Sequence, residues 1–130
     1  IRREGTYLRT RLSQTEHEIM EFFWDAQKEY DFKELMQHFN EEGGKEWKKQ
    51  TLNTFLSRLL DKGLLERRME GRKAYYRYQL DQKQYEQEKA KEVLENGYDG
   101  KISRFIAALT GNDSISDADE QELMEYIQKM

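Results

Sequence analysis

The chain has 130 residues, of which 36% are hydrophobic and 37% are charged, and its formal net charge is −4 at neutral pH. It contains no cysteine, which excludes disulfides, thiolate metal sites and cysteine nucleophiles, and no apolar run approaches the roughly 18 residues expected of a membrane span. This length fits one domain, or one domain with an appendage, and we expect a cytoplasmic protein without direct membrane binding.

The charge is distributed unevenly along the chain. Residues 43–79 carry ten basic and four acidic side chains, a net charge of +6, whereas residues 80–130 carry six basic and twelve acidic side chains, a net charge of −6. A basic segment within an acidic chain favours a local contact with an anionic partner such as nucleic acid.

Two helices are predicted before residue 45, after a basic and partly ordered arm at residues 1–12. Each helix begins with a capping box, in which the N-cap side chain and a glutamate three residues later satisfy each other's backbone N–H groups. The first helix is predicted over residues 14–28, and Gly43-Gly44 ends the second. The two boxes are Ser13 with Glu16 and Asp31 with Glu34.

The third helix, predicted over residues 48–62, has the clearest pattern. Gly63 follows it, at the position where a left-handed C-cap is expected. Its apolar side chains recur with the spacing of a helix that has one buried face, and they are Leu52, Phe55, Leu56, Leu59 and Leu60. The opposite face carries polar side chains that packing does not require, namely Gln50, Thr51, Thr54, Ser57 and Arg58.

The pattern changes from helical to alternating after residue 64. Residues 65–69 and 73–80 flank a tight turn at Glu70-Gly71-Arg72 and predict a β-hairpin. Three helices followed by a basic hairpin is the element order of a winged helix-turn-helix domain. We place this DNA-binding domain at residues 7–80.

Residues 81–130 are predicted to form a helical dimerisation domain. Helices at about 82–96, 99–110 and 116–129 share too little core to be stable alone, and a second copy would cover their apolar stripes. The fold class is therefore mainly α with a small β-hairpin: a winged helix-turn-helix domain plus a C-terminal helical dimerisation tail. The predicted dimer interface consists of Leu94, Tyr98, Ile102, Phe105, Ile106, Leu109, Leu123, Met124 and Ile127.

Several motifs together resemble the penicillinase repressor family, over roughly residues 12–130. The most specific is Trp47-x-x-x-Thr51-Leu52-x-Thr54-x-Leu56-x-Arg58-Leu59-x-x-Lys62-Gly63-Leu64 in the third helix. The first helix contributes Leu12-Ser13-x-x-Glu16-x-x-Ile19-Met20-x-x-x-Trp24. The C-terminal part contributes Asn96-Gly97-Tyr98 and Ser116-x-x-Asp119-x-x-Glu122-Leu123.

The resemblance implies a homodimeric repressor that binds a palindromic operator in double-stranded DNA through its third helix. Members of the family typically hold off resistance genes until a membrane sensor protease triggers cleavage within the tail. The usual scissile Asn-Phe pair would fall here at Arg104-Phe105, where Phe105 matches and Arg104 does not. The C-terminal cysteine cluster of copper-responsive members is absent, so no metal site and no cofactor are expected.

We expect the exposed N-terminal half of the third helix to read bases in the major groove. The predicted base contacts are Gln50, Thr51 and Thr54. The predicted phosphate contacts are Lys48, Lys49, Asn53, Arg58, Arg67, Arg68, Arg72, Lys73 and Arg77. The family usually has Ser-Pro where Lys48-Lys49 stands, so this helix loses its side-chain cap and gains two cations at the positive end of its dipole.

No catalytic site is expected, and we predict that the protein is not an enzyme. His17 and His38 lie on different predicted helices without partners at metal-ligand spacing. Four aromatic side chains are of the type that stacks on single-stranded nucleic acid, but their spacing fits core or hairpin packing better. They are Trp24, Trp47, Tyr76 and Tyr78.

Three other interpretations compete with the repressor. In the simplest interpretation, the polar face of the third helix is an ordinary solvated surface that binds nothing. A ligand-sensing winged-helix regulator would need a sizeable apolar cavity with convergent polar groups at the dimer interface. A winged-helix protein-interaction module without DNA binding would keep its function in a Gln50→Ala and Thr54→Ala double variant, whereas a repressor would lose operator discrimination.

Overall fold

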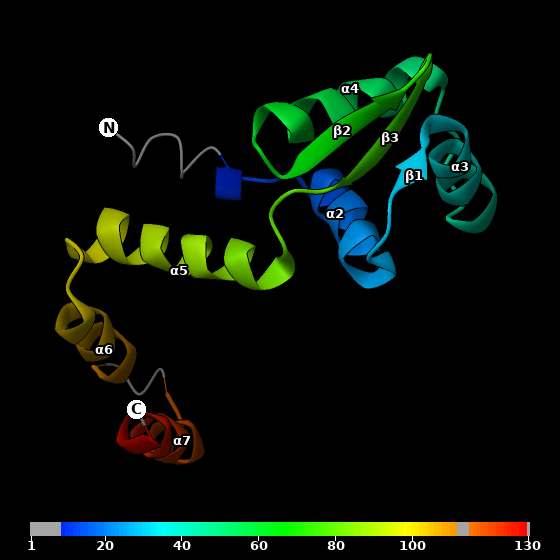
Figure 1. The fold of residues 1–130 in the computed structure, drawn as a ribbon. Coiled ribbons are helices and arrows are strands. Elements are labelled where there is room, and N and C mark those ends of the chain that lie inside the picture. The colour runs from blue at the N-terminus through cyan, green and yellow to red at the C-terminus, as the bar shows by residue number, and fades with distance from the viewer. Residues whose placement is uncertain (1–8, 112–114, 130) are drawn as a thin grey trace. The chain divides into compact units, whose positions relative to one another are not determined.

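The computed structural model describes residues 9–111 and 115–129, so most of the predicted arm at residues 1–12 lies outside the described residues. The chain forms two compact units that divide between Lys89 and Ala90, which we call the head unit and the tail unit. The predicted mainly helical fold with a small β-hairpin is confirmed. Its elements in chain order are α2 (Gln14–Ala26), β1 (Tyr30–Asp31), α3 (Phe32–Gln37), the π-helical turn η1 (His38–Glu42), α4 (Lys49–Asp61), β2 (Leu65–Glu70), β3 (Lys73–Tyr78), α5 (Gln82–Tyr98), α6 (Ile102–Thr110) and α7 (Asp117–Lys129) (Figure 1).

Both predicted capping boxes are confirmed. At the start of α2, Ser13 N donates to Glu16 Oε1 (2.8 Å) and Glu16 N donates to Ser13 Oγ (3.1 Å). At the start of α3, the N–H groups of Asp31 and Glu34 donate to each other's carboxylates at 2.9 and 2.8 Å. These contacts satisfy N–H groups that have no partner inside the helix, and they fix where each helix begins.

The predicted hairpin is confirmed, and we call it the wing. Leu65 pairs with Tyr78 at its base and Glu70 pairs with Lys73 at its tip, so a two-residue turn joins the strands. Gly71 opens this turn with φ of +64°, a conformation that glycine adopts without steric cost.

A third strand, β1, was not predicted from the sequence. It pairs antiparallel with β3, with Tyr30 opposite Tyr76, and gives the sheet the order β1-β3-β2. Two residues are too short to show an alternating pattern, so this strand is created by the free edge of β3 rather than by its own sequence. Figure 1 shows β1 at the edge of the sheet next to α3, and the wing alongside α4.

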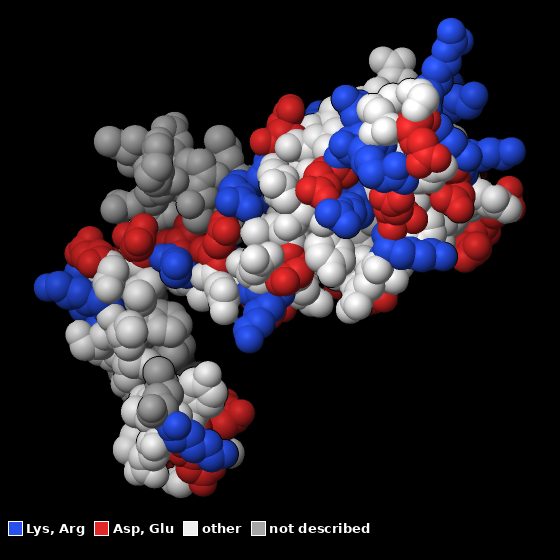
Figure 2. All heavy atoms as spheres, viewed as in Figure 1, with Lys and Arg blue, Asp and Glu red and all other residues white. Residues whose placement is uncertain are grey.

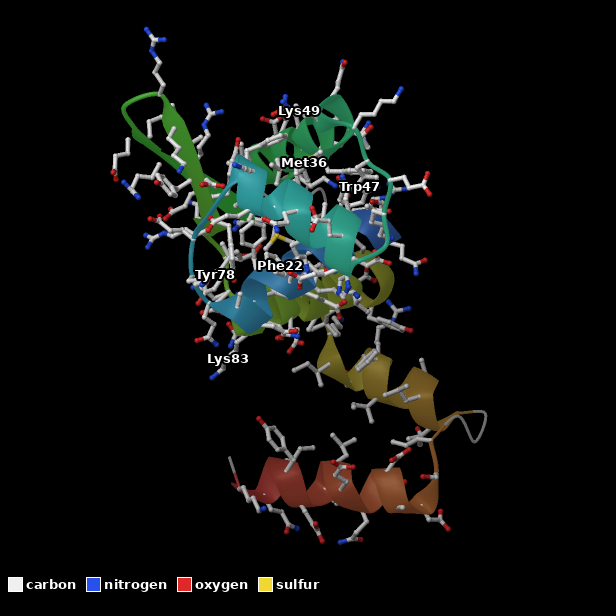
Figure 3. The ribbon with its side chains drawn as sticks, turned by 90° about the vertical axis from the view of Figure 1, so that its right-hand side faces the viewer. Phe22, Met36, Trp47, Lys49, Tyr78 and Lys83 are labelled. Carbon is white, nitrogen blue, oxygen red and sulfur yellow. The ribbon has the colours of Figure 1, made fainter. Side chains whose placement is uncertain are left out.

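The core of the head unit lies between α2, α3, α4 and the base of the sheet. Trp24 in α2 is buried and its Nε1 donates to the Leu80 carbonyl (3.0 Å), which ties this helix to the segment between β3 and α5. In Figure 3, Phe22 and Met36 lie between α2 and α3. The buried apolar side chains are Ile19, Met20, Phe23, Trp24, Leu35, Phe39, Leu52, Leu56, Leu59, Leu64, Leu65, Tyr76, Leu80 and Tyr85.

Helix α4 ends as predicted at a glycine C-cap. Gly63 has φ of +79°, its N–H donates to the Leu60 carbonyl (3.0 Å), and the N–H of Leu64 donates to the Leu59 carbonyl (3.0 Å). This pair of bonds is a Schellman motif, which turns the chain from the helix into β2. The end of the helix and the start of the wing are therefore fixed to each other.

Candidate nucleic-acid interface

The exposed face of α4 carries the three predicted base-contacting side chains. Gln50, Thr51 and Thr54 are exposed on the N-terminal half of the helix, whereas Leu52 and Leu56 on the opposite face are completely buried. The Thr54 hydroxyl donates to the Gln50 carbonyl (2.9 Å), so its proton is used inside the helix and its methyl group and oxygen lone pair remain for contact. The predicted orientation of this helix, with its leucines inside, is confirmed.

The start of α4 is positively charged and has no side-chain cap. Lys48 is the N-cap residue, and its carbonyl accepts hydrogen bonds from the N–H groups of Thr51 (3.0 Å) and Leu52 (3.2 Å). Lys48 and Lys49 are exposed, and Figure 3 shows Lys49 at the outer edge of the head unit. Two cations at the positive end of a helix dipole are unfavourable on their own, and a bound anion would offset that cost.

A side-chain clamp that was not predicted holds the segment before α4. Asn40 Nδ2 donates to the Trp47 carbonyl and Trp47 N donates to Asn40 Oδ1, both at 2.9 Å. The Trp47 ring packs on Phe39 and Phe55, with centroid distances of 5.2 and 5.4 Å. This clamp connects η1 to the N-terminus of α4 and thereby positions the predicted base-contacting face. Trp47 was visible as a motif residue, but nothing in the sequence pattern marked Asn40 as its partner.

Lys62, one of the basic residues of the 43–79 segment, faces the interior of the head unit. Its Nζ donates to Glu16 Oε1 and to the Arg11 carbonyl, both at 2.8 Å. Burial raises the pKa of Glu16, but the hydrogen bonds from Lys62 and Ser13 and the charge of Lys62 outweigh it, so the pKa lies below its ordinary value. This ion pair anchors the C-terminal end of α4 to α2.

Three of the predicted phosphate ligands on the wing are paired with carboxylates. Arg68 donates to both carboxylate oxygens of Glu29 (2.5 and 3.2 Å) and to Glu70 (2.8 Å). Lys73 Nζ lies 3.0 Å from Asp31 Oδ2, and Arg77 pairs with Glu66 across the hairpin. The pKa of Arg68 is raised because Glu29 and Glu70 accept its hydrogen bonds. In Figure 2, acidic and basic side chains lie intermixed on the visible face of the head unit.

The other predicted phosphate ligands carry no ion pair within residues 9–111 and 115–129. Two of these five cations stand at the start of α4, one lies further along its exposed face and two lie on the wing. All nine predicted ligands are exposed, including Asn53. The unpaired cations are Lys48, Lys49, Arg58, Arg67 and Arg72.

The aromatic side chains that were weighed as stacking platforms belong to the core. Trp24 and Tyr76 are buried, and Trp47 and Tyr78 pack against the core from its edge. His17 and His38 each lie near a glutamate one helical turn away on the same helical segment. Among the described residues no group of histidine, aspartate and glutamate side chains is arranged to hold a metal ion.

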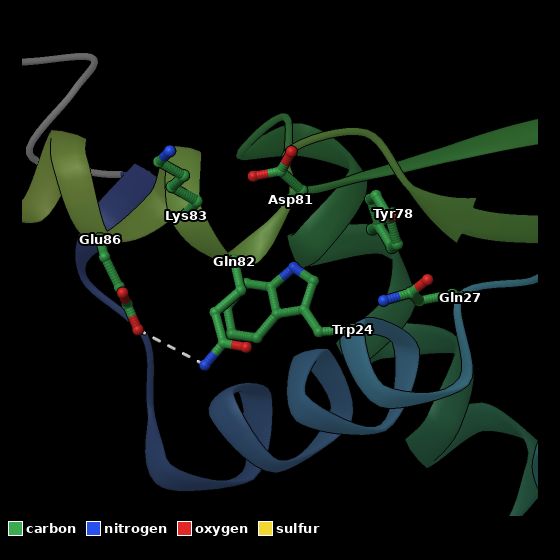
Figure 4. A pocket seen from close by; sticks show the side chains of 7 residues that line it. All are labelled: Trp24, Gln27, Tyr78, Asp81, Gln82, Lys83 and Glu86. Atoms are coloured by element: carbon green, nitrogen blue, oxygen red, sulfur yellow. Dashed lines mark hydrogen bonds between the residues drawn. The ribbon is translucent and has the colours of Figure 1, made fainter.

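A cavity of about 530 Å³ lies in the head unit between the end of α2, the end of β3 and the start of α5 (Figure 4). Its lining is mainly polar and charged, and Gln82 donates across it to Glu86 (3.4 Å). This lining differs from that of an apolar small-molecule pocket. The lining residues are Trp24, Gln27, Tyr78, Asp81, Gln82, Lys83 and Glu86.

The tail unit leaves most of its apolar side chains accessible. Helices α6 and α7 bury none of their described side chains, and Ile102, Met124 and Ile127 are 65%, 52% and 52% exposed. Half-buried side chains complete the predicted dimer-interface set. They are Leu94, Tyr98, Phe105, Ile106, Leu109 and Leu123.

The peptide bond between Arg104 and Phe105 lies inside α6. Arg104 is exposed and donates to Asp99 Oδ2 (2.6 Å), and the Phe105 ring packs edge-on against Tyr98 at a centroid distance of 5.3 Å.

None of the helices in the described part of the chain is both long and apolar enough to cross a lipid bilayer.

Three helices followed by a wing, with a polar face exposed on the third helix, define a winged helix-turn-helix protein of the DNA-binding class. The model of the penicillinase repressor family matches residues 12–129. The chain is also 25% identical over 118 residues, which are 91% of this chain and 90% of the other, to a penicillinase repressor of Bacillus licheniformis. The chain therefore belongs to the penicillinase repressor family, and it is a DNA-binding transcriptional repressor and not an enzyme. The resemblance inferred from the sequence motifs is confirmed.

Proposed function

We propose that this chain binds a palindromic operator as a homodimer, with residues 7–80 contacting DNA and residues 81–130 joining the two copies. The observation that carries the proposal is the arrangement of α4. Its side chains Leu52, Leu56 and Leu59 are completely buried, its polar N-terminal half is exposed, and two unpaired lysines stand at its start. A rigidly packed helix of this kind is suited to the major groove, which is wide enough to admit it.

The side chains on this face supply the chemistry of base recognition. Gln50 is long enough to pair with N6 and N7 of an adenine, and Thr51 carries both a hydroxyl and a methyl group. Because Thr54 donates its hydroxyl proton to the Gln50 carbonyl, it favours apolar contact with a thymine methyl or acceptance of a hydrogen bond from a base. These three residues are the proposed base contacts.

The unpaired cations are the strongest phosphate ligands. Lys48 and Lys49 stand where the backbone N–H groups of the first turn also favour an anion, and Arg58 extends the contact along the helix. Arg67 and Arg72 bring the wing to the neighbouring backbone. Asn53 adds a neutral hydrogen-bonding group.

Two copies would be joined through the accessible apolar side chains of the tail unit. Exposing apolar side chains to water is unfavourable, and the exposed ones here are Ile102, Met124 and Ile127. Burying them against a second copy would stabilise a dimer. Two-fold symmetry then places the two α4 helices about 34 Å apart, or a multiple of that distance, on one face of the duplex. The operator should accordingly consist of two inverted half-sites.

The regulated genes and the release step are also proposals. The family match supports control of a resistance operon, with release by a membrane sensor protease that cuts within the tail. Proteases bind extended backbone, so cleavage at Arg104-Phe105 requires α6 to unwind locally first. Mass spectrometry of the chain before and after induction would show whether fragments ending at Arg104 form.

The experiment that tests the proposed function is operator binding at several salt concentrations. If a dimer engages about 6–10 phosphates, affinity should fall ~10³–10⁵-fold between 50 and 200 mM salt. The Gln50→Ala and Thr54→Ala double variant should bind operator and unrelated duplex almost equally, with its salt dependence retained. A flat salt response, or a double variant that still discriminates, would count against the assignment.

A further inference from the structure

The two faces of the wing differ in charge and in contacts. Side chains alternate across a strand, so Leu65, Arg67 and Met69 share one face of β2, while Glu66, Arg68 and Glu70 share the other. The second face also holds the β3 partners Arg77, Tyr75 and Lys73, which lie opposite these residues in the register. On the first face Leu65 and Tyr76 are buried at the base of the wing, whereas Arg67 and Met69 are exposed closer to its tip. We call this first face, by its exposed outer part, the open face, and the second the paired face.

The paired face is neutralised by the head unit itself. Its three cations are each within salt-bridge distance of a carboxylate, and two of those carboxylates, Glu29 and Asp31, come from outside the wing. Arg68 has the most partners. It grips both oxygens of Glu29, donates to Glu70 and lies over the Tyr75 ring at 4.6 Å from the centroid. An arginine held on several sides is pre-organised, and freeing it for a phosphate would leave Glu29 unpaired beside the DNA.

The location of Glu29 gives the contact a structural purpose. Glu29 lies between α2 and β1, immediately before Tyr30, which pairs with Tyr76 in β3. The Arg68–Glu29 contact therefore joins β2 to the segment that β3 already binds on its other edge. Since β1 has only two residues, its ladder alone is a weak attachment, and the forked arginine–carboxylate pair adds to it across the width of the sheet.

We infer that Arg68 is a positioning residue, which braces the wing against the head unit through Glu29, and that the wing reaches DNA phosphates from its open face and tip. This inference rests on the proposed DNA-binding function. Arg67 is the matched comparison, because it is the adjacent arginine, lies on the open face and has no ion pair within the described residues. The two arginines thus have the same charge and nearly the same place along the strand, but opposite predicted roles.

The test compares full-length variants on two duplexes, one selected by the wild-type chain from a randomised pool and one of mixed sequence. Arg68→Gln and Glu29→Gln should each weaken binding to the selected duplex, roughly two- to fivefold, and the double variant should be no weaker than the weaker single variant. Arg68→Gln should keep the wild-type slope of log affinity against log salt. Arg67→Gln should lower that slope by about 1 for each protomer.

Arg68→Lys separates the two roles further. Lysine keeps the charge and can still meet a phosphate, but it lacks the fork that grips Glu29, so this variant should behave as Arg68→Gln does. The inference would be overturned if Glu29→Gln strengthened binding, if Arg68→Lys matched the wild type, or if Arg68→Gln lowered the salt slope. Each of these results would make Arg68 a phosphate ligand that Glu29 merely screens.

Amide hydrogen exchange tests the brace without DNA. Arg68→Gln and Glu29→Gln should both accelerate exchange at the β1–β3 ladder, and Arg67→Gln should leave it unchanged. Unaltered exchange in the first two variants would overturn the brace. Failure of the wild-type chain to bind any duplex would instead refute the proposed function, while the exchange measurement would still decide whether the brace exists.

Discussion

Both the head unit and the tail unit contain amphipathic helices, but the two units differ in how much of the apolar surface of these helices is buried. In the head unit Leu35, Leu52 and Leu56 are completely buried, whereas in the tail unit Ile102 is 65% exposed and α6 and α7 bury none of their described side chains. An apolar stripe in the sequence predicts a helix and shows which face of that helix burial would stabilise. It does not say whether the covering surface comes from the same chain, and among the described residues the head unit is the part that buries its own apolar faces.

Truncation of a buried leucine should distinguish the two units most strongly. Leu56→Ala should lower the free energy of unfolding of the head unit by ~2–5 kcal/mol, because it leaves a cavity in a completely buried site. Leu109→Ala, at a half-buried side chain of α6, should change this free energy by less than about 0.5 kcal/mol when the protein is dilute. Denaturant titration followed by tryptophan fluorescence measures both, and equal effects would contradict the contrast.

A charge in the tail unit should act on assembly instead. Ile102→Asp places a carboxylate in the proposed dimer interface, and we expect the dimer dissociation constant to rise at least roughly tenfold, with head-unit unfolding unchanged. Sedimentation equilibrium measures the dissociation constant, and Ser103→Asp at the neighbouring exposed position is the control. An unchanged constant for Ile102→Asp would remove this helix from the interface.

Replacing a glycine by alanine should change the free energy of unfolding in opposite directions in the two units. Gly63→Ala in the head unit forces alanine to adopt φ of +79° and should cost about 1 kcal/mol. Gly97→Ala in the tail unit lies within α5, where the added methyl group meets nothing within 4 Å, and should stabilise the helix by up to about 1 kcal/mol. Thermal unfolding followed by circular dichroism would show this reversal, and a loss of stability in both variants would contradict it.

The smallest expected effect is a dependence on pH that belongs to the head unit. The folded pKa of Glu16 lies below its ordinary value of 4.5, so its ion pair with Lys62 stabilises the fold above that value and is lost as the pH falls through the folded pKa. Glu16→Gln should therefore reduce the loss of stability on acidification below about pH 5. Denaturant midpoints measured across this pH range give the answer. Exposed Glu21→Gln in the same helix should leave the wild-type profile, and an unchanged profile for Glu16→Gln would mean that other carboxylates dominate.

Short-range features of the fold were predictable because their causes are local. Both capping boxes, the glycine C-cap at Gly63 and the turn at Gly71 depend on residues a few positions apart, and the facing of α4 follows from its 3.6-residue period. The exposure of Gln50, Thr51 and Thr54 follows from that facing alone. The candidate base-contacting surface could therefore be predicted without a tertiary structure.

The partners of the charged and polar side chains were decided by the tertiary structure. The wing's basic residues look equivalent in the sequence, but the fold brings Glu29 to Arg68 across 39 residues and Asp31 to Lys73 across the sheet, and it leaves Arg67 without an ion pair among the described residues. The Asn40–Trp47 clamp and the two-residue strand β1 arise in the same way, from edges and surfaces that exist only after folding. The periodicity of apolar residues predicts which side of a helix or strand faces the core. A specific side-chain contact requires distant segments to meet, and that depends on the packing of the whole unit.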